Sequence, residues 1–486
     1  MAVVLRAVRF PGPGPEVDLR LAGGIVEAVV PAGSADLRRR GDEEIGAPGA
    51  RVLPGLVDSH VHWTQWAQAR NRVDVGGARS PERAAALLAG AAAGRTGLVT
   101  GQGFRAGLWS RRPHKDVLER ALPGVAVALV SDDLHAAWLS PAALAVLGRD
   151  HPTGLFVEEQ ARIVVAELTA AVGDDESDRA ALDAASAAAA SGLTGIGDFE
   201  FADALAAWSR RAAGGRLPLR VRAAVWEPWL DRTVAAGLRT GDVVEGTAGL
   251  LEVGPFKVLA DGSLNTRTAA CHHPYPDAAD GHGVVTMSTE ELVALLVRVR
   301  GHGLEPAVHA IGDRANAMVL DAFDRSPGPG RIEHAQLVRV QDVARFVRPG
   351  LVASVQPQHA TADRDVAERH WPTVTARAFP FADLAAAGAR LEFGSDAPVS
   401  PPDPWAALAD AITRTDDDRP PWHPEQALDR RTALRAASAG RAAVRAGDPA
   451  DLTVVGTDPL AVDPSELRET PVLLTLCGGE PTHRTL

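Results

Sequence analysis

The segment RVLPGLVDSHVH, residues 51–62, decides the fold class that we predict. An apolar run of strand length ends in polar residues, as in a buried strand whose end opens on a site. Residues two apart in an extended chain face the same side, so His60 and His62 can point together. Imidazole is a common zinc ligand. Two histidines in this spacing are a weak signal by themselves, and a structural role is the alternative.

Seven later segments have the same pattern, an apolar run followed by polar residues. They are LTGIGDFE (193–200), LRVRAAVWE (219–227), PFKVLADGS (255–263), EPAVHAIGD (305–313), GRIEHAQ (330–336), LVASVQPQH (351–359) and RLEFGSDAP (390–398). Helical stretches such as STEELVALLVRVRGHG (288–303) alternate with them. Alternating strands and helices indicate parallel βα units. With the first segment included, this α/β pattern predicts a TIM-type (β/α)8 barrel rather than an open sheet.

The two ends of the chain differ from the middle. VVLRAVRF (3–10) and VDLRLAGG (17–24) near the start, and DLTVVG (451–456) near the end, are short alternating strands bounded by turn residues. We therefore predict a small β-sandwich domain built from residues 1–52 and 443–486. The barrel then occupies 53–442. It contains an insertion at about 64–150, which can cover the mouth of the barrel.

Three further polar residues stand where the predicted barrel strands end, which is where the catalytic groups of such barrels gather. His309, His334 and Asp396 each follow an apolar run. Lys257 lies within an otherwise apolar strand, where a buried amine is costly unless it is neutralised or paired. Together with the first pair of histidines, these residues predict a metal site.

The ordered motifs PGLVDSHVH, FKVLADGSLNTRTA, VHAIGDRA, RIEHAQ and FGSDAPVSPPDP resemble the amidohydrolase superfamily. Within it the chain is similar to amidohydrolase family 3, a group of metal-dependent hydrolases that includes N-substituted formamide deformylase. The resemblance extends through GDPADLTVVGTDP and so covers nearly the whole chain. It implies a distorted TIM barrel with a flanking β-sandwich. One departure lies at Asn265 and Thr266, where relatives usually have glycine and serine.

The resemblance also implies roles for the six polar residues. One or two divalent metal ions, zinc being the first candidate, would be held by His60 and His62 on one side and by His309 and His334 on the other. Lys257 would bridge two ions if CO2 converts its amine to a carbamate. Asp396 would be a further metal-site residue and act as general base, then as general acid, in hydrolysis of an amide, formamide or cyclic amide C–N bond.

Four residues are candidates for contact with a small-molecule substrate. His135 lies in SDDLHAAWLS, which resembles a substrate-side segment of the family, and a packed or helix-capping histidine is the alternative. For His359 the alternative is an ordinary loop residue, for Arg267 a structural salt bridge, and for Trp109 a place in a core. Glu158 is predicted to be a solvated helix start. The adjacent residues Cys271, His272 and His273 have poor geometry for one metal.

Composition limits the remaining classes of function. Acidic residues number 62 against 50 basic ones, giving a net charge of −12, and no basic run typical of nucleic-acid binding occurs. We find no signal-peptide core and no apolar run long enough for a membrane span. The 2 cysteines suit a reducing cytoplasm, where we expect the protein. Family resemblance adds a homodimer as an expected assembly.

Two other functional classes stay open at this stage. A non-catalytic binding protein could have kept the same scaffold, although such a protein would be expected to have lost a metal ligand. A deaminase, lactonase or isomerase could use the same metal site, because a fold does not determine a reaction.

Overall fold

The computed structural model describes residues 2–34, 37–70, 72–91, 97–276 and 281–486. Its centre is a sheet of eight strands in which every neighbouring pair is parallel. The strands are β6 (Leu56–Val61), β12 (Leu193–Asp198), β13 (Arg220–Val225), β14 (Leu251–Leu259), β15 (Pro306–Ala310), β16 (Gly330–His334), β17 (Leu351–Val355) and β18 (Arg390–Phe393). They coincide with the eight predicted segments. The predicted (β/α)8 fold class is therefore confirmed.

The first and last strands of this sheet meet just beyond β18. The Asp396 N–H donates to the His60 carbonyl at 2.7 Å, and the His62 N–H donates to the Ala397 carbonyl at 2.7 Å. A glycine is required here, because a Cβ on Gly394 would lie 2.6 Å from the Cβ of His60 and 2.8 Å from its backbone nitrogen. The closure of the barrel thus brings Asp396, three residues beyond β18, beside His60 and His62 at the end of β6.

Helices return the chain between successive strands, and their sequences explain where they begin. Helix α9 (Thr289–Gly301) starts at a capping box, in which Ser288 and Glu291 satisfy each other's backbone N–H groups. Helix α10 (Asp313–Arg325) buries an apolar stripe that includes Val319, Leu320 and Phe323. Most residues of the strands are buried, and in β17 all of them are.

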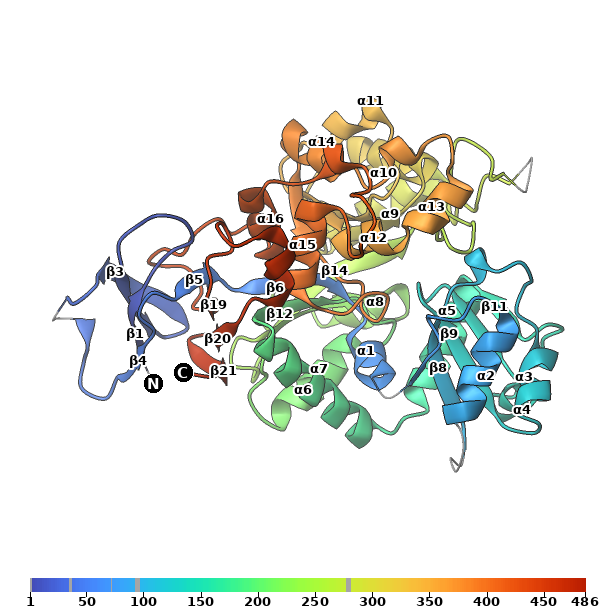
Figure 1. Cartoon of the computed structure of the whole chain (residues 1–486), viewed down its shortest axis with the longest axis horizontal. Coiled ribbons are helices and arrows are strands. Elements are labelled where there is room, and N and C mark those ends of the chain that lie inside the picture. Colours follow the sequence, from blue (N-terminus) through green and yellow to red (C-terminus); the bar gives the residue numbers. More distant parts are fainter. Residues whose placement is uncertain (1, 35–36, 71, 92–96, 277–280) are drawn as a thin grey trace.

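Both ends of the chain contribute to a pair of smaller sheets. One has the order β3–β2–β1–β4 and consists of β1 (Val3–Val8), β2 (Val17–Ala22), β3 (Ile25–Pro31) and β4 (Glu43–Gly46). The other has the order β21–β20–β19–β5 and combines β5 (Arg51–Pro54) with β19 (Leu452–Val455), β20 (Val472–Cys477) and β21 (Glu480–Arg484). Their buried faces share one core, in which Leu5 and Leu19 join Leu452 and Leu476. The two termini lie near each other in this part of the molecule (Figure 1).

A third unit lies between β6 and β12. Its sheet has the order β11–β10–β9–β8–β7, and its strands are β7 (Val73–Asp74), β8 (Val99–Phe104), β9 (Val127–Ser131), β10 (Ala136–Leu139) and β11 (Leu155–Val157). Helices α2 (Pro81–Ala91), α3 (Lys115–Ala121), α4 (Pro141–Val146) and α5 (Glu159–Ala170) pack around it. This unit lies on the opposite side of the barrel from the terminal sheets (Figure 1). In the described residues, no helix has the length and apolar character needed to cross a membrane.

Candidate metal centre

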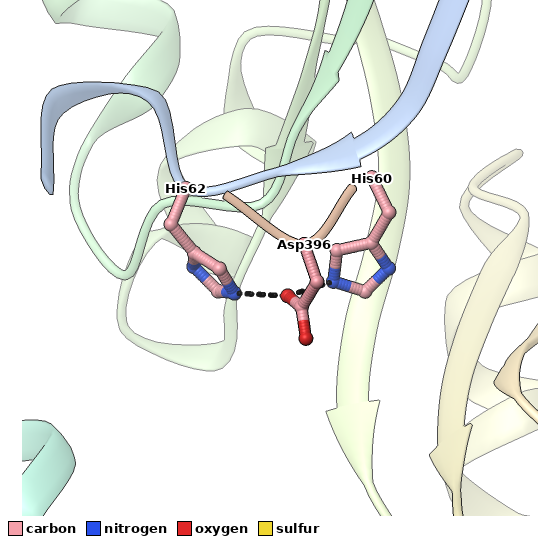
Figure 2. A group of neighbouring side chains, drawn as sticks. All are labelled: His60, His62 and Asp396. Carbon is pink, nitrogen blue, oxygen red and sulfur yellow. Dashed lines mark ion pairs between the residues drawn. The ribbon is translucent and has the colours of Figure 1, made fainter. Parts of the chain in front are cut away.

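Three side chains converge where the barrel closes. The Nε2 atoms of His60 and His62 lie 3.4 and 3.3 Å from the same carboxylate oxygen of Asp396 (Figure 2). The alternation of strand residues turns both imidazoles to one side, and the backbone pairing beyond β18 supplies the carboxylate. Two imidazole nitrogens and a carboxylate at this spacing could hold one divalent metal ion.

A second group of candidate ligands adjoins the first. The ring of His334, at the end of β16, lies with its centroid 5.0 Å from that of His60 and 4.5 Å from that of His309 on β15. The Lys257 amine, on β14, lies 4.7 Å from the centroid of the Phe199 ring, which in turn stacks on His60 at 4.3 Å. The six residues predicted as a metal site therefore line one cavity.

Hydrogen bonds to neighbours determine which imidazole nitrogen is free in three of these histidines. His60 Nδ1 lies 2.7 Å from Glu333 Oε2, and His334 Nδ1 lies 3.0 Å from Gln356 Oε1. His309 Nε2 lies 3.2 Å from the carbonyl of Gly262. Each partner atom is an acceptor, so the neutral ring donates to it and keeps a lone pair on its other nitrogen. That tautomer suits coordination of a metal.

Burial favours the uncharged form of the ring nitrogens and of the amine. Desolvation, reinforced by the charge of Lys257, lowers the pKa of His60 to about 4. It also holds the pKa values of His309 and His334 well below the ordinary histidine range. The pKa of Lys257 falls to about 8 for the same reason. Neutral imidazoles and an amine that loses its proton readily are the states that bind metals or react with CO2.

The backbone is strained at the site. His334 and Asp396 have φ angles of 78° and 57°, a region that residues other than glycine seldom adopt. Such conformations cost about 1–3 kcal/mol each and persist where the surrounding structure enforces them. Here they turn the imidazole and the carboxylate toward the common centre at the ends of their strands.

The open pocket around these residues, counted with the solvent space at its mouth, has a volume of about 650 Å³. The unit between β6 and β12, called the insertion from here on, contributes Asp133, Leu134, His135 and Glu158 to its wall. Another part of the wall is apolar and includes Val165, Phe201, Trp226 and Leu259. The space accommodates a small organic molecule with polar groups near the histidines and an apolar portion against the aromatic rings.

The four predicted substrate contacts lie in different places. His135 lines the cavity. His359 is buried beside the centre, and its ring is parallel to that of His334 with centroids 6.4 Å apart. Arg267 is in the turn after β14 with a φ of 61°, and it is not among the described residues that line the cavity. Trp109 is a core residue of the insertion, because its indole N–H donates to the Ala78 carbonyl and its ring packs on Trp138.

The structure corrects one prediction and adds two residues. Glu158 is not a solvated helix start, since its carboxylate accepts a hydrogen bond from His135 and borders the cavity. Glu333, missed in the sequence, is fully buried between His60 and Arg331. Asp261 accepts three backbone N–H groups and lies 3.5 Å from His309 Nε2. A carboxylate inside an apolar strand, as in Glu333, was the signal that could have identified such a partner.

Another group of metal-ligand types contains none of the six predicted residues. Cys271, His273 and Asp313 bring one ligand atom each to within 4.8 Å of one another. The carboxylate of Asp313 is engaged, since it accepts from the His272 N–H at 2.8 Å and from Arg377 at 3.1 Å. The structure thus joins Cys271 and His273 with Asp313 and not with the adjacent His272.

Known proteins share this architecture along most of the chain. The sequence matches the model of the Amidohydrolase family over residues 43–483. It is 28% identical to the amidohydrolase YtcJ of Bacillus subtilis, with 90% of each chain covered, and 26% identical to N-substituted formamide deformylase of Arthrobacter pascens, with 90% of this chain and 89% of that one covered.

A solved structure agrees with these relatives. A metal-dependent hydrolase from Pyrococcus horikoshii superimposes with a TM-score of 0.79 at 26% identity, covering 96% of this chain and 99% of that one. The expected family resemblance is therefore confirmed. The chain belongs to the amidohydrolase family of metal-dependent hydrolases.

Proposed function

We propose that the protein hydrolyses a C–N bond of an amide, formamide or cyclic amide. The observation that carries this proposal is the meeting of His60, His62, His309, His334, Lys257 and Asp396 in one cavity. One relative is named for the deformylation of N-substituted formamides, which is a reaction of this class. The room beside the metal-ligand residues fits the acyl group and the amine substituent of such a substrate.

One or two divalent ions, with zinc as the first candidate, would be held by the four histidines together with Asp396. Such an ion, when bound, activates water near neutral pH and polarises a carbonyl group. The hydrogen bonds of His60 to Glu333 and of His334 to Gln356 fix the ring orientations that this binding requires.

Lys257 is the proposed bridge between two ions. Its amine nitrogen would add to the carbon of CO2 and release a proton, which gives a carbamate with carboxylate character. Its surroundings support this role, because the amine is buried on β14 next to Phe199 and among the candidate ligands. An unmodified Lys257 would leave a site for a single metal.

Asp396 is the proposed proton carrier. Its carboxylate lies within 3.4 Å of the imidazoles of His60 and His62, and it borders the cavity in which a water and a carbonyl carbon can meet. In the proposed reaction it accepts a proton from the attacking water and then donates that proton to the departing amine nitrogen. Its strained φ holds the carboxylate at this place.

A screen of N-formyl and N-acyl amines tests the function. Protein loaded with zinc or manganese is expected to release amine from at least one of them, and a chelator should abolish the reaction until metal is restored. Nucleobase amines, lactones and dipeptides belong in the same panel, because they report deaminase, lactonase and dipeptidase activities of the same centre. Turnover of only those compounds, or of none by a fully metal-loaded protein, would reject the proposal.

A further inference from the structure

A histidine and a glutamate from the insertion form a partly buried pair at the edge of the candidate metal centre. His135 Nδ1 lies 2.7 Å from Glu158 Oε2, and the two side chains are 19% and 24% exposed. The pairing extends to the backbone, because the Glu158 N–H donates to the His135 carbonyl at 2.8 Å. Both side chains line the cavity that holds the candidate metal ligands.

The other oxygen of Glu158 is held by the barrel. Oε1 accepts hydrogen bonds from the hydroxyl groups of Thr266 at 2.6 Å and of Thr268 at 2.5 Å, both in the turn after β14. A third link between the two units joins Ser263 Oγ to Asp133 Oδ2 at 2.6 Å. Glu158 therefore has partners on both oxygens. This arrangement suits a group that positions a neighbour better than one that binds substrate itself.

The local backbone supports the same interpretation. Glu158 has a φ of 52° at the start of α5, and Leu134, the residue before His135, has a φ of 62°. A glycine would adopt either conformation at lower cost. The chain instead places a functional carboxylate and a cavity-lining residue at these positions, as is typical of strain kept for a site.

The hydrogen bond to Glu158 determines which nitrogen of the His135 ring is left for another partner. Because a carboxylate is an acceptor, Nδ1 carries a hydrogen and donates it, and Nε2 is the nitrogen left for another partner. Among the described residues, no protein group forms a hydrogen bond with Nε2. The ring centroid of His135 lies 5.6 Å from that of His309, so this nitrogen belongs to the immediate surroundings of the metal centre.

We propose that His135 is a catalytic residue that donates a hydrogen bond from Nε2–H to the substrate oxygen that gains negative charge, and that Glu158 is its positioning residue. This inference rests on the proposed function and deepens it. The carboxylate of Glu158, 2.7 Å from Nδ1, favours the imidazolium form, in which both nitrogens carry hydrogen. A fixed donor at such an oxygen typically contributes about 10²–10³-fold in rate.

The pair of His135 and Glu158 gives the insertion a proposed role in catalysis. The insertion would supply one donor of the oxyanion site. The hydroxyl groups of Thr266 and Thr268 fix the position of Glu158 relative to the barrel. The residue at 266 is one of the two departures from the family pattern. Its hydroxyl is here a direct partner of the positioning carboxylate.

The test compares His135→Asn and Glu158→Gln with the wild type, all loaded with zinc. A matched control is Glu167→Gln, which removes a carboxylate on the same helix that pairs with Arg149 at the surface. We expect His135→Asn to lower kcat about 10²–10³-fold with little change in KM, as for loss of an oxyanion donor. Glu158→Gln should lower kcat less, and the control should not change it.

Two further readouts keep the test independent of turnover. Zinc content should stay at the wild-type value in all variants, and the affinity for methylphosphonate, a tetrahedral anion, should fall at least ten-fold in His135→Asn when measured by calorimetry. Unchanged kcat and unchanged phosphonate affinity would overturn the proposal, as would loss of zinc, which would make His135 a ligand. A rise in KM alone would also overturn it. If no amide is hydrolysed but phosphonate affinity still depends on His135 and Glu158, the proposed function fails and the pair stands.

Discussion

An Asp396→Asn protein is expected to keep its bound metal and to lose about 10²–10⁴-fold in kcat, the usual contribution of a general acid–base group. Asparagine has nearly the same shape and retains one oxygen directed at His60 and His62. It cannot accept a proton from water at neutral pH, so the proton transfers at both ends of the proposed reaction lose their carrier. The comparison needs kcat on the best amide of the screen, with metal content measured on the same samples.

Asp231→Asn is a suitable control for this change. Asp231 lies on α8 (Glu227–Ala235) with its side chain fully exposed, so the same chemical substitution there should leave kcat unchanged. A protein with Asn at 396 that retains metal and works within about three-fold of the wild type would show that another group moves the proton. Loss of metal with activity would assign Asp396 chiefly to coordination.

A Glu333→Gln change should weaken both the fold and the metal site. Glu333 is fully buried and joins His60 at 2.7 Å to Arg331 at 2.7 Å, and Arg331 also pairs with Glu392 at 2.6 Å. Burial opposes ionisation, but Arg331 and His60 hold the pKa of Glu333 well below its usual range. The substitution removes one charge from a buried network, for which we expect a loss of about 3 kcal/mol in the free energy of unfolding.

The same substitution should also weaken metal binding, because Glu333 is the hydrogen-bond partner of His60. With a neutral amide as its partner, the imidazole is a poorer ligand and its ring is held less firmly, so zinc affinity should fall about 10–100-fold. Urea unfolding of the metal-free protein and competition with a chelator measure the two effects separately. Glu167→Gln, at an exposed ion pair, should cost at most about 1 kcal/mol and leave zinc affinity unchanged. Wild-type values for Glu333→Gln in both measurements would contradict the proposed role.

The barrel, and the residues that gather at the candidate metal centre, could be predicted because both follow from local pattern. Strand-length apolar runs ending in polar residues gave the eight strands, and alternation along a strand put His60 and His62 on one side. Parallel strands in a barrel bring their ends together, so His309, His334 and Asp396 could be assigned to the same site as His60 and His62, from which they are distant along the chain.

Residues whose role depends on distant contacts could not be predicted in this way. Glu158 stands at the start of a helix like many solvated glutamates, and its burial depends on a positive φ and on two threonine hydroxyls of the turn after β14. From the sequence, Trp109 is a candidate for substrate contact with a core position as the alternative, and the structure places its ring in the insertion's own core. The alternation of strands and helices that predicts the barrel does not predict how an insertion folds.

Anomalous diffraction at the zinc edge from zinc-loaded crystals tests the central claim most directly. We predict a peak in the cavity lined by His60, His62, His309, His334, Lys257 and Asp396, about 2.0–2.1 Å from the Nε2 atoms of His60 and His62. A second peak beside His309 and His334, with density for a carbamate on Lys257, would match the two-metal form of the site. The account would be contradicted by zinc-loaded crystals with no peak in this cavity, or with the peak among Cys271, His273 and Asp313 instead.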